Sequence, residues 1–158
     1  MSETATVSPS ARRRSPPLGF AARTLTVLFC VALYPVTAFG GEPNFPGPYE
    51  SAQTLLAFFQ ARPAALLLCA FLQFGPAIPL GIFTASAVSW LRFLGVGAAG
   101  ADIALFGGFA TSFLIMANAR VLWTMTDPVV TNDATVLQTL YYFGFGWGGP
   151  GFSVSLEF

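Results

Sequence analysis

The sequence predicts an all-α fold, a polytopic transmembrane helical bundle of about four spans with kinked or broken helices. Two properties of the 158-residue chain support this prediction: 54% of its residues are hydrophobic and only 9% are charged. An ordinary globular domain carries about 25% charged residues, because its surface is in contact with water. The third observation is the range 64–91, which contains no charge and is longer than the roughly 20 residues that a membrane-spanning helix needs.

The N-terminal part divides into a tail and a first apolar segment. Residues 1–23 are rich in Ser, Pro and Arg, and their low apolar content predicts a disordered cytoplasmic tail. The rest of the chain, 24–158, is predicted to be the transmembrane helical domain. Its first span is expected at 24–40, interrupted by Pro35. Because arginines precede this span, it also resembles a secretory signal, and cleavage is the alternative to a retained first helix.

A short helix and a long one are predicted next. The range 41–48 contains three prolines and cannot be helical. Ser51 is a suitable N-cap for a helix over 52–62, which is too short to cross a core of ~30 Å and is expected to lie at the interface or to extend the next helix. Pro63 suits the first position of the second span, 64–91. Pro76 and Pro79 predict a kink in its middle.

The C-terminal half contains two further apolar segments. A Gly-rich connection, 95–100, leads to a third span over about 101–123. A polar loop is expected at 126–135, and a fourth span, aromatic and rich in glycine, at 136–158. No basic residue follows this last segment, so we expect the sequence to be truncated and further helices to follow.

The distribution of arginines predicts the orientation. With the N-terminus in the cytoplasm, the tail and the loop between the second and third spans carry five of the seven arginines, and only Arg62 and Arg120 fall on the outside. Basic residues are retained on the cytoplasmic side of a membrane. The sequence therefore predicts a bacterial inner-membrane protein with a cytoplasmic N-terminus.

The stretch 144–151 is the most unusual part of the sequence. Gly144 and Gly148 form a G-x-x-x-G pair, which allows helix backbones to approach closely in lipid. Gly149, Pro150 and Gly151 are suited to break a helix within the membrane, and transporters use such breaks to bind substrate. Two interpretations stay open: a kinked, tightly packed helix, or a discontinuous helix that lines a site.

Polar residues within the predicted spans are the other candidates for function. Gln73 could hydrogen-bond across helices or satisfy backbone freed by a proline, and Arg92 is a possible partner for Asp102. Arg120 can extend its side chain to the headgroups. The candidate intramembrane polar and hinge residues are Gln73, Pro76, Pro79, Asp102, Asn118, Arg120, Gly148, Gly149, Pro150 and Gly151.

Several functional classes are disfavoured by what the sequence lacks. It has no histidine and no lysine, which removes His-based zinc chemistry, Ser-His dyads and Ser-Lys pairs. Two matches to G-x-G-x-x-G, at 95–100 and 146–151, lack the strand that a nucleotide site requires. The basic residues do not favour nucleic acid. We therefore expect a protein that is not an enzyme and has no cofactor or metal. Cys30 and Cys69 are expected at different depths, too far apart for a disulfide.

Three apolar motifs carry a resemblance to a known family. The run Phe71-Leu72-Gln73-Phe74-Gly75-Pro76-Ala77-Ile78-Pro79-Leu80-Gly81-Ile82-Phe83, with the segments 104–109 and 148–152, resembles a family of uncharacterised bacterial multi-pass membrane proteins, a domain of unknown function. The resemblance covers about residues 24–158 and implies a bundle that continues with further helices. It implies no activity.

The sequence leaves two functions open. The first is a non-enzymatic helical bundle that acts as a membrane or partner module, in contact with the lipid bilayer and with a partner helix or a second copy of itself. The second is a small-molecule transporter or channel component with a polar site at a discontinuous helix. If Gln73, Asn118 and the Gly-rich break line one cavity, the second function is favoured.

Overall fold

The computed structural model describes residues 17–34, 45–96, 98–151 and 155, and these residues form no strand. The all-α prediction is therefore confirmed for this part of the chain. The elements, in chain order, are α1 (Leu18–Leu33), α2 (Ala52–Ala61), α3 (Pro63–Phe93), α4 (Ala98–Thr124), the 3₁₀ helix η2 (Val130–Asn132), α5 (Ala134–Gly146) and the π-helix η3 (Trp147–Gly151).

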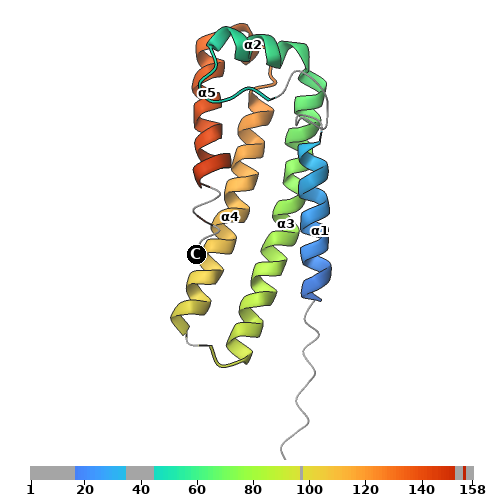
Figure 1. The fold of residues 1–158 in the computed structure, drawn as a ribbon, viewed down its shortest axis with the longest axis vertical. Helices are drawn as coiled ribbons and strands as arrows, with labels where there is room; N and C mark the ends of the chain where they lie inside the picture. The colour runs from blue at the N-terminus through green and yellow to red at the C-terminus, as the bar shows by residue number, and fades with distance from the viewer. Residues whose placement is uncertain (1–16, 35–44, 97, 152–154, 156–158) are drawn as a thin grey trace, which may run out of the picture.

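A hairpin of the two longest helices forms the centre of the fold. Helices α3 and α4 run antiparallel, with α1 packed along α3 and α5 along the part of α4 nearest to α2 (Figure 1). The turn between α3 and α4 contains Gly95 with a φ of 77°, a backbone conformation that favours glycine. Helix α3 continues through Pro76 and Pro79 without interruption. Its first residue is Pro63, as predicted.

Small side chains bring α3 and α4 together. A Cβ atom at Gly108 would lie 2.3 Å from the side chain of Thr84, so only glycine fits there. The buried Ser112 hydroxyl donates a hydrogen bond of 2.6 Å to the carbonyl of Ala77 on the other helix. Close backbone approach and hydrogen bonds between helices are the usual basis of helix packing in lipid.

The largest core lies at the end of the bundle that α2 covers. Helix α2 lies across this end, over α5 and the start of α3 (Figure 1). The predicted cap is confirmed, because the Ser51 hydroxyl accepts a hydrogen bond of 3.1 Å from the Thr54 N–H. The core comprises Leu55, Phe58 and Phe59 of α2 with Leu66, Cys69, Ala70, Leu122, Met125, Leu137 and Tyr141.

Two predicted boundaries are wrong. Helix α1 begins at Leu18, inside the range assigned to the tail, because the carbonyl of Pro17 accepts the N–H groups of Phe20 and Ala21 and starts the helix. Helix α5 begins at Ala134, inside the predicted polar loop, because the Asp133 carboxylate caps it by accepting two backbone N–H groups. The remainder of the predicted tail and the predicted interruption at Pro35 lie outside the described residues.

Two of the four predicted spans are supported within the described residues, where only α3 and α4 are long and apolar enough to cross a membrane, judged by length and composition. Helix α1 has 16 residues, and the α-helical part of the predicted fourth span ends at Gly146 after 13 residues. The missing N–H of Pro150 explains this early end, because it interrupts the α-helical hydrogen-bond pattern.

Candidate functional site

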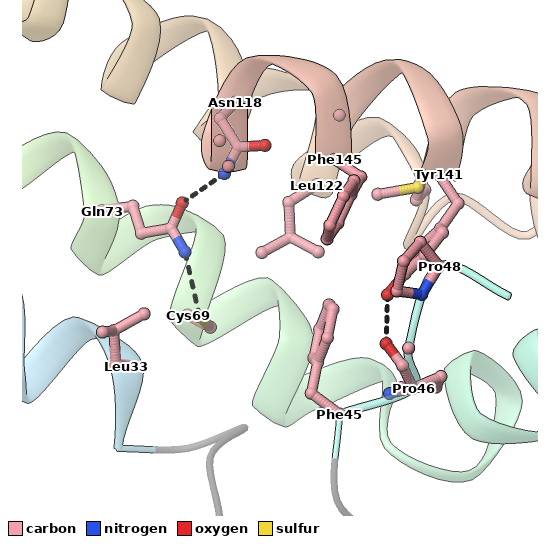
Figure 2. Close-up of a pocket in the computed structure, with 15 residues that line it drawn as sticks. Leu33, Phe45, Pro46, Pro48, Cys69, Gln73, Asn118, Leu122, Tyr141 and Phe145 are labelled. Atoms are coloured by element: carbon pink, nitrogen blue, oxygen red, sulfur yellow. Dashed lines mark hydrogen bonds between the residues drawn. The ribbon is translucent and has the colours of Figure 1, made fainter. Parts of the chain in front are cut away.

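A cavity of about 370 Å³ lies between α3, α4, α5 and the segment 45–48, close to the end covered by α2 (Figure 2). Its volume falls within the range of 300–1,000 Å³ that is typical of small-molecule sites. The residues that line it are Leu33, Phe45, Pro46, Gly47, Pro48, Cys69, Gln73, Asn118, Leu122, Met125, Tyr141, Gly144, Phe145, Gly148 and Gly149.

Two half-buried amide side chains form the polar part of the cavity wall. The Asn118 Nδ2 of α4 donates a hydrogen bond of 3.3 Å to the Gln73 Oε1 of α3. The Gln73 Nε2 in turn donates to the Cys69 Sγ, one helical turn earlier, at 3.5 Å. Figure 2 shows this chain of side chains crossing from one helix to the other. The expected hydrogen bond of Gln73 across helices is present.

The break in α5 forms a second wall. Pro150 has no N–H to donate to the carbonyl of Gly146, so the chain forms a π-helix there, and Gly151 lies against that carbonyl instead. Gly148 of this π-helix lies directly against Asn118, because an added Cβ would stand 2.7 Å from the Asn118 Cγ. An added Cβ at Gly144 would stand 3.1 Å from the Val121 Cγ1 of α4. Both glycines of the G-x-x-x-G pair therefore face α4.

The segment 45–48 closes the cavity on the side of α2. The Tyr141 hydroxyl donates a hydrogen bond to the carbonyl of Pro46. The ring of Phe45 stacks on that of Tyr141 with centroids 5.9 Å apart, and packs edge-on against Phe58 at 5.5 Å. Tyr141 therefore connects this segment to α5 by a hydrogen bond and a ring contact.

Four of the ten candidate residues named from the sequence meet at this cavity: Gln73, Asn118, Gly148 and Gly149. Pro76 is buried within α3, and neither it nor Pro79 lines the cavity. Gly151 is packed against the carbonyl of Gly146, and the side chain of Pro150 lies outside the described part of the chain.

The two charged candidates lie elsewhere. Asp102 forms an ion pair of 2.5 Å with Arg92 at the α3–α4 turn, the partner expected from the sequence. Both side chains are more than half exposed. Arg120 is exposed on α4 and does not line the cavity.

Sequence reasoning missed Tyr141 and the segment 45–48. Tyr141, Gly144 and Gly148 are spaced by three and four residues, so a helical pattern places them on one face of α5. That spacing was the available signal for Tyr141. The segment 45–48 has no periodic pattern, and only its contacts with the rings of Tyr141 and Phe58 bring it to the cavity.

The polar groups of the cavity are few and uncharged. Among the described residues that line it, none carries a charge, and the polar groups are two amides, a phenol and a thiol. The described residues contain no group of three or more His, Cys, Asp or Glu that could hold a metal ion.

Comparison of the chain with protein-family models, with curated proteins and with solved structures finds no match. The resemblance to an uncharacterised bacterial membrane protein family therefore stays a prediction from the sequence motifs.

Proposed function

We propose that this chain is an integral membrane protein that binds a small molecule in the cavity at Gln73 and Asn118, as a component of a transporter or channel. The observation that carries the proposal is the meeting of three features around one cavity: an amide on α3, an amide on α4 and the glycines of the π-helix that continues α5. Discontinuous helices beside polar groups form substrate sites in many transporters. The proposal contains no catalytic step.

The exposed surface of the hairpin supports residence in a membrane. In the most apolar 18-residue windows of α3 and α4, only 39% and 28% of the residues are buried. The core helix of a soluble protein would be mostly buried, whereas a lipid-facing helix leaves such side chains outside. The exposed large side chains of the two helices include Phe71, Ile78, Ile82, Phe106, Phe109 and Phe113.

The spacing of polar and aromatic residues along α4 supports a position in the bilayer. From Asp102 to Trp123 the helix rises about 31 Å, close to the ~30 Å of the hydrocarbon core. Asn118 lies about 24 Å along the same path, which places the cavity toward the side of α2. The N-terminus of α1 points toward the same end as the α3–α4 turn (Figure 1). We propose that this end is cytoplasmic, in a bacterial inner membrane.

A second candidate is a membrane module that binds a partner helix or a second copy of itself. The observation that favours it is the aromatic row Phe106, Phe109 and Phe113 on α4, which is exposed. Only lipid or another helix can cover such a row in a membrane. This function needs no access to the cavity, and that difference allows a test.

The test measures alkylation by N-ethylmaleimide, a small neutral reagent, in a chain carrying Cys30→Ser, Cys69→Ser and Asn118→Cys, because Asn118 lines the cavity and is partly exposed, whereas Cys69 is fully buried. Right-side-out and inside-out membrane vesicles are loaded with glutathione, which removes reagent that has crossed the membrane. A transport component exposes its site to either side in turn, so the introduced cysteine should react in both preparations. Reaction from one side only contradicts transport, and protection from both sides contradicts an accessible cavity and favours the partner module.

Single cysteines at the two ends provide the controls. Tyr49 is 98% exposed near α2, and Val96 is exposed in the α3–α4 turn. In a chain without other cysteines, Tyr49→Cys should react only in right-side-out vesicles and Val96→Cys only in inside-out vesicles. The opposite pattern would overturn the proposed orientation.

A further inference from the structure

We infer that the ligand of the cavity is an uncharged, mostly hydrocarbon molecule with one small group that both donates and accepts hydrogen bonds, such as a carboxamide or a hydroxyl. This inference rests on the proposed function and names the ligand class of the same site. Three properties of the cavity lead to it: its charge, the hydrogen-bonding groups it leaves open, and its apolar walls.

The charge of the cavity disfavours ions. None of the described lining residues is charged, so an ion that entered would lose its hydration without gaining an opposite charge. Glu50 lies close enough to Tyr141 for its charge to act on the phenol, which further disfavours an anion beside this wall. For a cation, the amide pair offers only neutral carbonyl oxygens, which replace little of the lost hydration. A neutral molecule avoids each of these costs.

The amide pair leaves hydrogen-bonding capacity open. Each primary amide has two N–H groups and an oxygen that can accept two hydrogen bonds. The Asn118 Nδ2 uses one N–H on Gln73, and the Gln73 Nε2 uses one on the weakly accepting sulfur of Cys69. Within the described residues, no hydrogen bond reaches the Asn118 Oδ1. The pair therefore offers N–H donors and a carbonyl acceptor side by side, and a ligand group with both functions satisfies both.

The other walls suit a hydrocarbon body. Apolar and aromatic side chains line the rest of the cavity: Leu33, Phe45, Leu122, Met125 and Phe145. The volume of about 370 Å³ is at the lower end of the range for small-molecule sites. This size fits a small compact molecule better than a peptide.

The experiment compares four probes that share a benzene ring: benzamide, ethylbenzene, benzoate and benzylammonium. Binding to the full chain in nanodiscs is measured by equilibrium dialysis, with empty nanodiscs subtracted. We expect benzamide to bind at least tenfold more tightly than either charged probe. In Gln73→Met, which keeps the volume and removes the amide, benzamide affinity should fall by about fivefold to tenfold. Ethylbenzene affinity should change by less than about twofold.

The variant Gly146→Ala is the matched control, because a Cβ there meets no atom within 4 Å. It should bind benzamide like the parent chain. Circular dichroism establishes that each variant is folded, and Asn118→Leu repeats the test if Gln73→Met does not fold. Tighter binding of benzoate or benzylammonium would overturn the inferred ligand class.

Equal benzamide affinity in the parent and Gln73→Met would overturn the role of the amide pair. The outcomes separate this inference from the proposed function. If no neutral probe binds while the cysteine introduced by Asn118→Cys is still alkylated from both sides, the ligand class is wrong and the proposed function stands. If no probe binds and that cysteine is protected from both sides, both are wrong.

Discussion

Replacing Gly148 by alanine tests the most constrained contact of the cavity. The new Cβ would lie 2.7 Å from the Cγ and Nδ2 of Asn118 and 2.8 Å from its Oδ1. Ordinary contact begins at 3.4 Å, so the planar amide must move by about 0.7 Å or rotate. The hydrogen bond from the Asn118 Nδ2 to the Gln73 Oε1 is already 3.3 Å long. A displacement of this size is therefore enough to break it.

The magnitude follows from three contributions. Overpacking of this kind costs about 1–3 kcal/mol, and the lost hydrogen bond adds about 1 kcal/mol. Alanine lowers the conformational entropy of the unfolded chain relative to glycine, which stabilises the folded variant by about 0.4–1 kcal/mol. We therefore expect Gly148→Ala to lower the free energy of unfolding by about 1–4 kcal/mol. Circular dichroism of the detergent-solubilised chain during SDS titration measures this change.

Two comparisons make the result specific to the contact. Gly146→Ala meets no neighbouring atom within 4 Å and should leave stability unchanged or raise it slightly. In an Asn118→Ala background the obstructing amide is absent, so Gly148→Ala should cost at least about 1 kcal/mol less than in the parent chain. If Gly148→Ala costs the same in both backgrounds, the contact between Gly148 and Asn118 does not exist as described.

Three further substitutions have defined outcomes. Gly108→Ala places a Cβ 2.3 Å from Thr84 and should destabilise the α3–α4 hairpin by about 1–3 kcal/mol in the same SDS titration. Tyr141→Phe leaves the carbonyl of Pro46 without its donor, at a cost of about 1–3 kcal/mol. Melting temperatures of the parent chain and the variant measure this loss. Asp102→Asn removes an exposed ion pair and should cost no more than about 1 kcal/mol at low salt and almost nothing at 1 M salt.

The parts of the fold that local chemistry determines were predictable. The uncharged run before Arg92 specifies α3, Ser51 specifies the start of α2, and the proximity of Arg92 to Asp102 follows from the short turn between two helices. The start of α1 was not predictable, because it depends on one backbone group, the carbonyl of Pro17. The end of α-helical geometry before Pro150 agrees with the disruption expected at Gly149–Gly151, because the sequence itself shows which residue lacks an N–H.

The candidate site was predictable only in part, for a related physical reason. Gln73 and Asn118 stand out because amides are costly inside a membrane, and Gly148 stands out by its glycine spacing. Tyr141 resembles an ordinary interfacial aromatic residue until its hydrogen bond to Pro46 is known. A polar side chain on a helix can be recognised by its type, whereas the irregular segment that completes a cavity depends on contacts far apart in the sequence.

In the Gly-rich stretch, the missing side chain of one residue allows close packing and also leaves space in the cavity wall. Gly148 allows η3 to approach α4 until its backbone touches Asn118, which is close packing. The same residue also lines the cavity, since no side chain there occupies the space beside the amide pair. The π-helix that positions Gly148 depends on Pro150, which withholds an N–H from the carbonyl of Gly146. Packing and cavity therefore have a common origin in the sequence, and a substitution that fills the contact should remove the site with it.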